Sequence, residues 1–480
     1  MTSPPTLPDG LVVVVKRDCA TCRLVVPVLR ELAAVGPLTV YSQDDPSFPD
    51  GLEGVVDDTE LEVSYRLDLD TVPTLLRVVD GVETGRTIGW RRDRWEDLTG
   101  HTGLGADLPD QRPGCGSISV DPDRVDDLRV RFEGGVLHAR RVEIASMEDE
   151  AEAMYDRGWT DGLPVVAPTE ARVLRMLEGT TRAPDDVVAV IPPDLVACTV
   201  EKVAINAVLA GCRPEYLPVV IAAVEAACTD EFNMHGLLAT TWFSGPVVMV
   251  NGPIARRIGM NSGGNAMGQG NRANATIGRA LQLVVRNVGG GRPGEVDRAT
   301  LGQPGKYTFC FAEDEAGSPW EPMSVERGLP EGANAVTLFA GEGPRGVVDQ
   351  ISRTPESLAR SFAACLRTVA HPKLPLAFDA TLVVVPEHAR VFSEAGWSKA
   401  RLRTELGELL QLDCDDLVRG ADGIEEGIAT AFAGMTLPKF RDGGLLIVHA
   451  GGGAGLFSAI IGGWASGKVG SQPVTREVAT

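Results

Sequence analysis

Short apolar runs, bounded by polar or glycine-rich turns, recur along the whole chain. Residues 11–15 are all apolar and predict a buried strand, while the apolar positions of residues 24–32 recur at helical spacing. From residue 119 onward, runs of strand length alternate with runs of helical spacing, which predicts an α/β protein. The predicted strands are 187–191, 246–250, 307–311, 335–339, 381–385 and 445–448. The predicted helices are 170–177, 200–209, 217–227, 273–287, 355–370 and 398–409.

One polar stretch, HTGLGADLPDQRPGCGS, interrupts this alternation early in the chain. It is rich in Gly, Pro and Asp, and it predicts a linker over residues 101–118. The linker separates a first domain, 1–100, from a larger α/β region, 119–480. The larger region is either one substrate-binding domain or two closely associated lobes. A chain of 480 residues is long enough for each domain to bury its own core.

The charge of the chain is strongly acidic, with 66 Asp and Glu residues against 45 Lys and Arg and a net charge of −21. Such a surface repels phosphate backbones and anionic lipid, so we expect neither a nucleic-acid nor a membrane partner. The amino terminus lacks the basic and long apolar regions of a signal peptide, and no apolar run approaches the ~18 residues of a membrane span. A cytoplasmic location follows as an expectation.

Nine cysteines are scattered along the chain, and this odd number does not suggest a disulfide framework. Cys19 and Cys22 form the one close pair. A zinc site needs four ligands, and neither a second pair nor a histidine cluster supplies them, so no metal is predicted. Cys19 falls at the first turn of the predicted helix, where free N–H groups lower a thiol pKa. Cys22 is then placed to resolve a mixed disulfide formed by Cys19.

A strand, the two cysteines and a helix containing Pro27 are followed by Thr71-Val72-Pro73-Thr74, by the hairpin signal Asp80-Gly81 and by Gly89. In this order and spacing, residues 9–100 resemble the thioredoxin-fold family. The resemblance implies that Pro73 is the cis-proline whose loop packs against the dithiol. It also implies that Val72 offers its backbone to an extended substrate. The sequence departs from the family in having Lys16-Arg17-Asp18 in place of the usual Trp, and Ala20-Thr21 between the cysteines.

Two glycine-rich segments of the larger region are candidate anion sites, because glycine admits a ligand close to backbone N–H groups at a helix start. The first precedes the helix predicted from residue 273, with Asn271 and Arg272 at its start. The second contains Gly452 and Gly453 and is followed by a helix predicted to begin at Phe457 and Ser458. The alternative in both cases is that glycine serves only the folding of the loop.

Three further positions could supply reactive groups. Glu387 and His388 follow a predicted strand and could act as an acid/base pair, although a histidine there is often structural. Cys198 precedes a helix that Thr199 could cap, which would activate its thiol. Cys115, flanked by glycines in the predicted linker, could exchange with Cys19 or be an incidental small residue.

We therefore expect a thiol-dependent oxidoreductase in which the CxxC dithiol serves a fused domain that binds a small anionic substrate. One alternative is a lyase, hydrolase or isomerase housed in the larger region, with the dithiol keeping Cys198 or Cys115 reduced. Another is a non-enzymatic binding protein that is switched by redox state. No bound cofactor is expected; a low-molecular-weight thiol or a thioredoxin-reductase-type protein would supply electrons. The composition is also compatible with a homo-oligomer.

Overall fold

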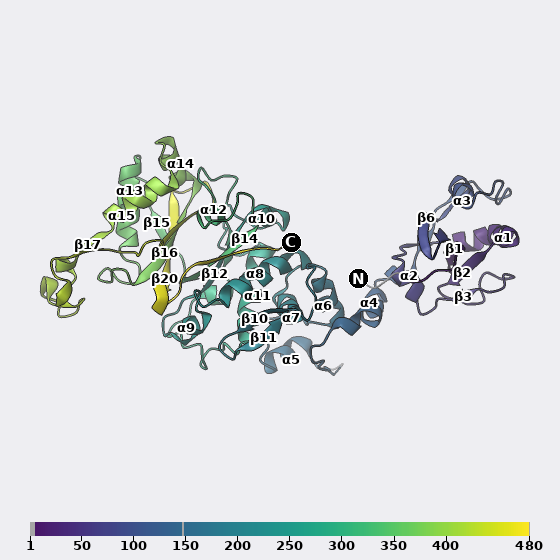
Figure 1. Ribbon diagram of the computed structural model, residues 1–480, viewed down its shortest axis with the longest axis horizontal. Helices are drawn as coiled ribbons and strands as arrows, with labels where there is room; N and C mark the ends of the chain where they lie inside the picture. The colour runs from purple at the N-terminus through teal and green to yellow at the C-terminus, as the bar shows by residue number, and fades with distance from the viewer. Residues whose placement is uncertain (1–4, 146–147, 480) are drawn as a thin grey trace. The chain divides into compact units, whose positions relative to one another are not determined.

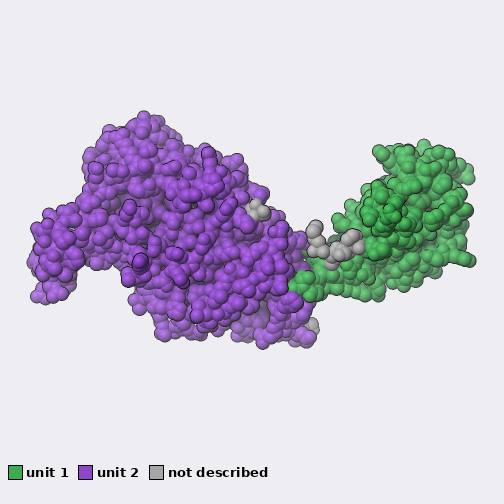
Figure 2. Space-filling view, viewed as in Figure 1, with its two compact units in different colours: residues 1–137 green, residues 138–480 purple. Residues whose placement is uncertain are grey.

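The computed structural model describes residues 5–145 and 148–479. The chain divides into two compact units, residues 1–137 and 138–480 (Figure 2). Both units combine helices with strands in mixed sheets (Figure 1), and this confirms the predicted α/β class. In the part of the chain that the structure describes, no helix is both long and apolar enough to cross a bilayer.

The first unit is built on a five-stranded sheet of order β3-β2-β1-β5-β6. Strand β1 is parallel to β2 and antiparallel to β5. The strands are β1 (Gly10–Val15), β2 (Leu38–Ser42), β3 (Val56–Asp57), β5 (Thr74–Val79) and β6 (Val82–Ile88). The helices are α1 (Ala20–Val35), α2 (Glu62–Arg66), α3 (Arg92–Thr99) and α4 (Val125–Glu133). Asp80 and Gly81 both have positive φ, 54° and 74°, which confirms the predicted hairpin turn between β5 and β6.

The predicted linker over residues 101–118 belongs to the first unit instead of standing free of it. Two short strands within it pair with the body of this unit. Strand β8 (Gln111–Arg112) pairs with β7 (Trp90–Arg91), and β9 (Cys115–Gly116) pairs with β4 (Thr71–Val72). The boundary between the units falls after residue 137 and not near residue 100. The cause is the backbone pairing of this polar stretch with the first unit, which the composition does not reveal.

The second unit contains an eight-stranded sheet whose main path runs β13-β12-β14-β20-β16-β19. Strand β15 pairs with β20, and β21 pairs with β14. The strands are β12 (Gly245–Asn251), β13 (Cys310–Ala312), β14 (Ala335–Gly341), β15 (Arg345–Val348), β16 (Phe378–Val384), β19 (Leu445–His449), β20 (Phe457–Ala465) and β21 (Val474–Glu477). Two antiparallel strand pairs lie outside this sheet, β10 (Val187–Ile191) with β11 (Val196–Thr199) and β17 (Gln411–Asp413) with β18 (Thr436–Pro438).

Helices of the second unit pack on one another and on this sheet (Figure 1), with α8 against β14 and α7 against α11. Their first group is α5 (Glu150–Asp156), α6 (Glu170–Leu177), α7 (Val200–Ala210), α8 (Leu217–Ala227), α9 (Met234–Ala239), α10 (Pro253–Arg257) and α11 (Arg272–Asn287). Their second group is α12 (Met323–Glu326), α13 (Pro355–Leu366), α14 (Pro386–Glu394) and α15 (Lys399–Leu409).

The predicted strands and helices of this region are present, most of them with ends shifted by one to four residues. One prediction is wrong. Phe457 and Ser458 begin the strand β20 instead of a helix. This strand lies between β14 and β16 and is buried along most of its length, and a buried apolar run has no polar face by which the sequence could distinguish a strand from a helix.

Candidate functional site

Cys19 lies between the end of β1 and the start of α1 and is the N-cap residue of that helix. Its backbone is extended, with φ −141° and ψ 119°, and its Sγ accepts a hydrogen bond from the backbone N–H of Cys22 at 3.3 Å. Serine, threonine and aspartate usually make this contact at a helix start. The predicted position of Cys19 at the start of the helix is confirmed.

The turn before Cys19 is fixed by the carboxylate of Asp44, which follows the neighbouring strand β2. Asp44, just after β2, accepts hydrogen bonds from the backbone N–H groups of Arg17 and Asp18 at 2.6 and 2.8 Å. The backbone N–H of Lys16 is directed at the Sγ of Cys22 at 3.5 Å. Lys16 thus contacts Cys22 through its backbone, and Asp44 fixes the turn that leads into Cys19.

The two thiols of the pair have opposite pKa shifts. The pKa of Cys19 is lowered to about 5, chiefly by hydrogen bonding from Cys22 and also from Cys115, and this outweighs the effect of burial. Burial raises the pKa of Cys22, and its hydrogen bond to Cys19 raises it further. At neutral pH, Cys19 is therefore a thiolate and Cys22 a thiol.

A third sulfur completes this cluster. Cys115 Sγ lies 2.8 Å from Cys19 Sγ, and the carbonyl oxygen of Val72 lies 3.6 Å from Cys19 Sγ. Val72 precedes Pro73 through a cis peptide bond. Only 1% of Cys19 and none of Cys22 is exposed, whereas Cys115 is partly exposed. All nine cysteines lie in the described part of the chain and are free thiols.

The resemblance implied that Val72 offers its backbone to an extended substrate. In the structure this backbone edge is already occupied. Val72 is paired with Cys115 in the β4–β9 ladder. This pairing could not be predicted from the sequence, because the glycines and proline around Cys115 indicate a loop and not a strand.

Cys198 does not have the activated position that the sequence suggested. It lies in β11, one residue before the N-cap Thr199, and it is fully buried. Burial raises its pKa to about 12, and Lys202 offsets this only in part. The expected lowering of this pKa is wrong because Cys198 is buried in the core, where its Sγ donates to the carbonyl oxygen of Thr199 at 3.7 Å.

Glu387 and His388, predicted as a pair, and Ser458, predicted in another segment, come together in the second unit. His388 Nδ1 lies 2.7 Å from Ser458 Oγ, and its Nε2 lies 3.1 Å from the carbonyl oxygen of Asp349. Glu387 accepts the backbone N–H of Leu456 at 2.7 Å. His388 and Ser458 are each only 1% exposed. Both ring nitrogens of His388 are engaged, so this cluster joins α14 to β20 and leaves no ring nitrogen for a substrate.

The two glycine-rich segments, predicted as separate anion sites, lie against each other. Gly451 donates its N–H to the carbonyl oxygen of Ser262 at 2.8 Å, and a Cβ on Gly452 would lie 3.2 Å from Gly264 Cα. Gly453 is exposed in the same turn. Here glycine allows two loops to touch.

Asn271 and Arg272 stand at the start of α11, as the sequence suggested. Asn271 caps the helix by accepting the N–H of Asn274, and it donates to the carbonyl oxygen of Gly259 at 2.8 Å. Arg272 is exposed and donates to the carbonyl oxygen of Gly211 at 2.9 Å. The amide of Asn271 is thus engaged by protein, and Arg272 is the group of this pair that faces solvent.

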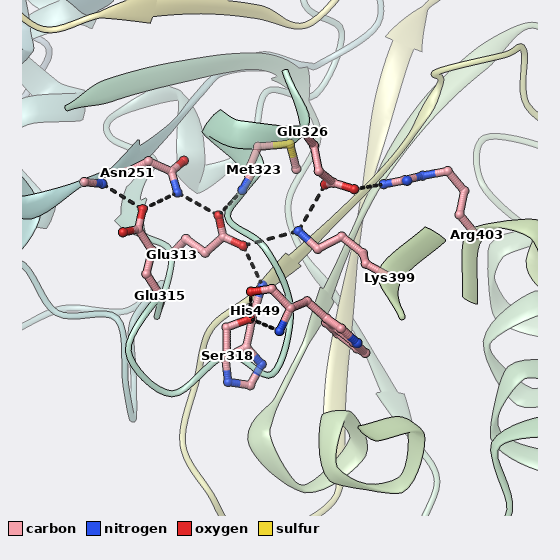
Figure 3. Close-up of polar contacts among 11 residues, drawn as sticks. Asn251, Glu313, Glu315, Ser318, Met323, Glu326, Lys399, Arg403 and His449 are labelled. Atoms are coloured by element: carbon pink, nitrogen blue, oxygen red, sulfur yellow. Dashed lines mark hydrogen bonds and ion pairs between the residues drawn. The ribbon is translucent and has the colours of Figure 1, made fainter. Parts of the chain in front are cut away.

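Sequence reasoning missed a buried ionic network at the carboxyl ends of β12, β13 and β19 (Figure 3). Lys399 lies 3.0 Å from Glu326 and 3.7 Å from Glu313, and its side chain is 1% exposed. Arg403 pairs with the other oxygen of Glu326 at 2.9 Å. Glu313 also accepts hydrogen bonds from Asn251 and the backbone N–H of Met323, both at 2.7 Å. Burial raises the pKa of Glu313, although Lys399 opposes this.

His449 lies beside this network at the end of β19, and its backbone N–H approaches Glu313 at 3.4 Å (Figure 3). The imidazole is fully buried, and neither ring nitrogen has a hydrogen-bond partner among residues 5–145 and 148–479. The carboxylate of Asp314 lies 3.9 Å from Nε2. Burial lowers the pKa of His449, so the ring is neutral at pH 7.

No protein-family model matches this chain, and no curated protein matches it. The function is therefore inferred from the geometry of the two units. Of the clusters described above, the cysteine cluster of the first unit is the one that combines a nucleophile, a resolving thiol and a partly exposed cysteine residue.

Proposed function

We propose that the protein is a thiol–disulfide oxidoreductase whose electrons come from Cys19 and Cys22 in a thioredoxin-like first unit. The observation on which this proposal mainly rests is the position of the Cys19 sulfur at the start of α1, beside Cys22 and Cys115. This sulfur is the N-cap of α1, accepts the Cys22 N–H and has a pKa of about 5, so it is a thiolate at neutral pH. The thiolate is the form of cysteine that attacks disulfides.

The thioredoxin-like fold is supported by the way in which its characteristic residues meet in space. The cysteine pair follows β1 at the start of α1, and Pro27 lies inside this helix. Val72, distant in sequence, lies beside Cys19 and is joined to Pro73 by a cis peptide bond. These are the positions on which the family resemblance depends.

The reaction transfers two electrons from the dithiol to a substrate disulfide. One sulfur of the protein displaces the first substrate thiolate and forms a mixed disulfide. A second protein sulfur then displaces the remaining thiolate, and the Cys19–Cys22 disulfide is the final oxidised product. The protonated Cys22 releases its proton as it attacks, and the departing thiolate takes that proton up. Each turnover yields one substrate thiol, one substrate thiolate that takes its proton from solvent, and one protein disulfide.

We propose in addition that the second unit binds the small anionic substrate that this dithiol reduces. Support for an anion comes from Arg272, exposed at the start of α11. An external thiol or a reductase of the thioredoxin-reductase type would return the dithiol to its reduced form. A cytoplasmic location fits this proposal, because a reducing compartment keeps the nine thiols free.

Glutathione disulfide, a small anionic disulfide, serves as the probe for the test. Reduced protein is mixed with it, quenched in acid, alkylated and digested with trypsin. Cys19 and Cys22 share the peptide 18–23, so their disulfide appears as a loss of two hydrogens in that peptide. We expect this disulfide to form with release of two glutathione molecules in the wild type and in the control Cys365→Ser. Reduced Cys19 and Cys22 in the wild type, or unchanged release by Cys19→Ser, would contradict the proposal.

A further inference from the structure

Residues 109–119, here called the Cys115 segment, lie along the part of the first unit that contains Cys19. The segment pairs with β4 in the register Val72↔Cys115 and Thr71↔Gly116. Thr21, between the two cysteines of the CxxC pair, donates its hydroxyl to the carbonyl oxygen of Pro113 at 2.6 Å. The segment is thus bound both to β4, which precedes Pro73, and to the first turn of α1.

Beyond Cys115, the segment is anchored by buried polar groups. Gln43, which is 2% exposed, donates to Ser117 Oγ at 2.6 Å and accepts the backbone N–H of Ile118 at 3.1 Å. Ser119 donates its hydroxyl to the carbonyl oxygen of Leu69 at 2.9 Å. These contacts tether Cys115 on its carboxyl-terminal side.

This arrangement separates the reactive sulfur from the accessible one. Cys19 is the thiolate but only 1% of the residue is exposed, and Cys22 is completely buried. Cys115 is partly exposed and its sulfur lies 2.8 Å from Cys19 Sγ. A disulfide bond is about 2.05 Å long, so a small movement brings these two sulfurs to bonding distance. An external disulfide meets Cys115 before it can meet Cys19.

We infer that Cys115 is a third redox cysteine, the thiol through which a substrate disulfide exchanges with the buried Cys19–Cys22 pair. This inference rests on the proposed oxidoreductase function and adds the entry step to it. The substrate is a disulfide whose sulfur can reach the surface at Cys115, such as that of a small thiol.

The exchange of a substrate disulfide with the buried pair through Cys115, here called the relay, balances in protons and electrons. Cys115 attacks the substrate disulfide RSSR, its proton passes to Cys19 across the 2.8 Å contact, and RS⁻ leaves. The departing RS⁻ removes that proton from Cys19 and becomes RSH. Cys19 then attacks the Cys115 sulfur, which forms the Cys19–Cys115 disulfide and releases a second RS⁻.

In the last step, Cys22 attacks Cys19, gives its proton to the second RS⁻ and releases Cys115 as a thiolate. Two electrons have passed from Cys19 and Cys22 to the substrate, and Cys115 returns without net oxidation.

Trypsin places Cys115 in the peptide 95–124, because the bond between Arg112 and Pro113 resists cleavage. A Cys19–Cys115 disulfide therefore joins two peptides, whereas the Cys19–Cys22 disulfide lies within one. With glutathione disulfide as the probe, we expect the cross-link to accumulate in Cys22→Ser and to precede the Cys19–Cys22 disulfide in the wild type.

Two variants, Cys115→Ser and Cys115→Ala, test whether the relay is needed. Without the entry thiol, substrate reaches Cys19 only when the segment opens. We expect the Cys19–Cys22 disulfide to form about tenfold more slowly in both variants, the factor that corresponds to an opening cost of about 1.4 kcal/mol.

Wild-type rates in both variants, or glutathione attached first to Cys19 in the wild type, would overturn the relay. Those outcomes leave the proposed oxidoreductase intact, because the Cys19–Cys22 disulfide still forms. If that disulfide forms in no variant and not in the wild type, the oxidoreductase itself fails.

Discussion

Cysteines of this chain differ in acidity because their sulfurs receive different numbers of hydrogen bonds. Cys19 accepts the N–H of Cys22 and lies within hydrogen-bonding distance of Cys115, and its pKa is about 5. Cys198 is equally buried but lies inside a strand pair without such donors, and its pKa is raised to about 12. Hydrogen bonding to the sulfur, and not burial alone, decides which thiol is a nucleophile.

Lys399 is a buried cation whose charge is compensated by neighbouring carboxylates. It balances Glu313 and Glu326 in the interior of the second unit. The substitution Lys399→Met removes the cation beside the buried Glu313 and leaves Glu326 paired with Arg403 alone, and we expect the free energy of unfolding of the second unit to fall by about 3–5 kcal/mol. Urea unfolding measures this loss. The matched control is Lys468→Met, because Lys468 is exposed. A loss below about 1 kcal/mol would show that the network is not a stabilising feature.

At the scale of elements, the position of the Cys115 segment depends on one glycine. A Cβ on Gly114 would lie 2.7 Å from the carbonyl oxygen of Val72 and would collide with the methyl group of Thr71. A Cβ on Gly116, two residues later, would meet nothing within 4 Å. Gly114 therefore permits the close approach of the segment to β4, while Gly116 does not contribute to it.

We expect Gly114→Ala to displace the Cys115 segment and to make Cys19 severalfold more reactive toward iodoacetamide at neutral pH. The loss of the Cys115 contact also raises the pKa of Cys19. Gly116→Ala should behave as the wild type. Alkylation of the peptide 18–23, followed by mass spectrometry, measures the difference. Equal alkylation of both variants would show that the segment does not cover Cys19.

The sequence predicted the elements of this site better than their assembly. The apolar run of residues 11–15 and the helical spacing after it placed Cys19 at a helix start, because those signals are local. The pairing of Cys115 with Val72 joins segments that are far apart in the chain, and nothing in the glycines around Cys115 indicates a strand. Similarly, Glu313, Glu326 and Lys399 come from separate elements, and each alone resembles an ordinary surface charge.

At the scale of the whole molecule, each unit has its own buried core. One apolar cluster surrounds β1 and α1 of the first unit, and two others lie around the large sheet of the second. The redox state of the cysteines should therefore change the stability of the first unit and leave that of the second unit unaltered.

The lowered pKa of Cys19 makes this effect depend on pH. An unfolded thiol has a pKa of about 8.5, so between about pH 5 and 8.5 the unfolded chain binds one proton more than the folded one. The stabilisation is fully present above the unfolded pKa and is lost as the pH falls toward 5. The contribution of Cys19 to the free energy of unfolding of the reduced first unit should therefore rise with pH, by up to about 1.4 kcal/mol per pH unit.

Hydrogen exchange of α1 in reduced protein, measured by mass spectrometry across this pH range, tests this expectation. The rise of the free energy of unfolding with pH should be smaller in Cys19→Ser than in the wild type, by the amount that Cys19 contributes. In Cys365→Ser it should equal that of the wild type. The same slope in Cys19→Ser as in the wild type would assign the pH dependence to other groups.

The ionisation of Cys19 is the claim on which the account depends most, and the ultraviolet absorbance of the thiolate at about 240 nm reports it directly. Reduced protein is titrated from about pH 3.5 to 9.5, beside Cys19→Ser and Cys365→Ser. We predict a step near pH 5 in the wild type and in Cys365→Ser that is absent from Cys19→Ser. A wild-type titration without any thiolate below about pH 8 would contradict the account.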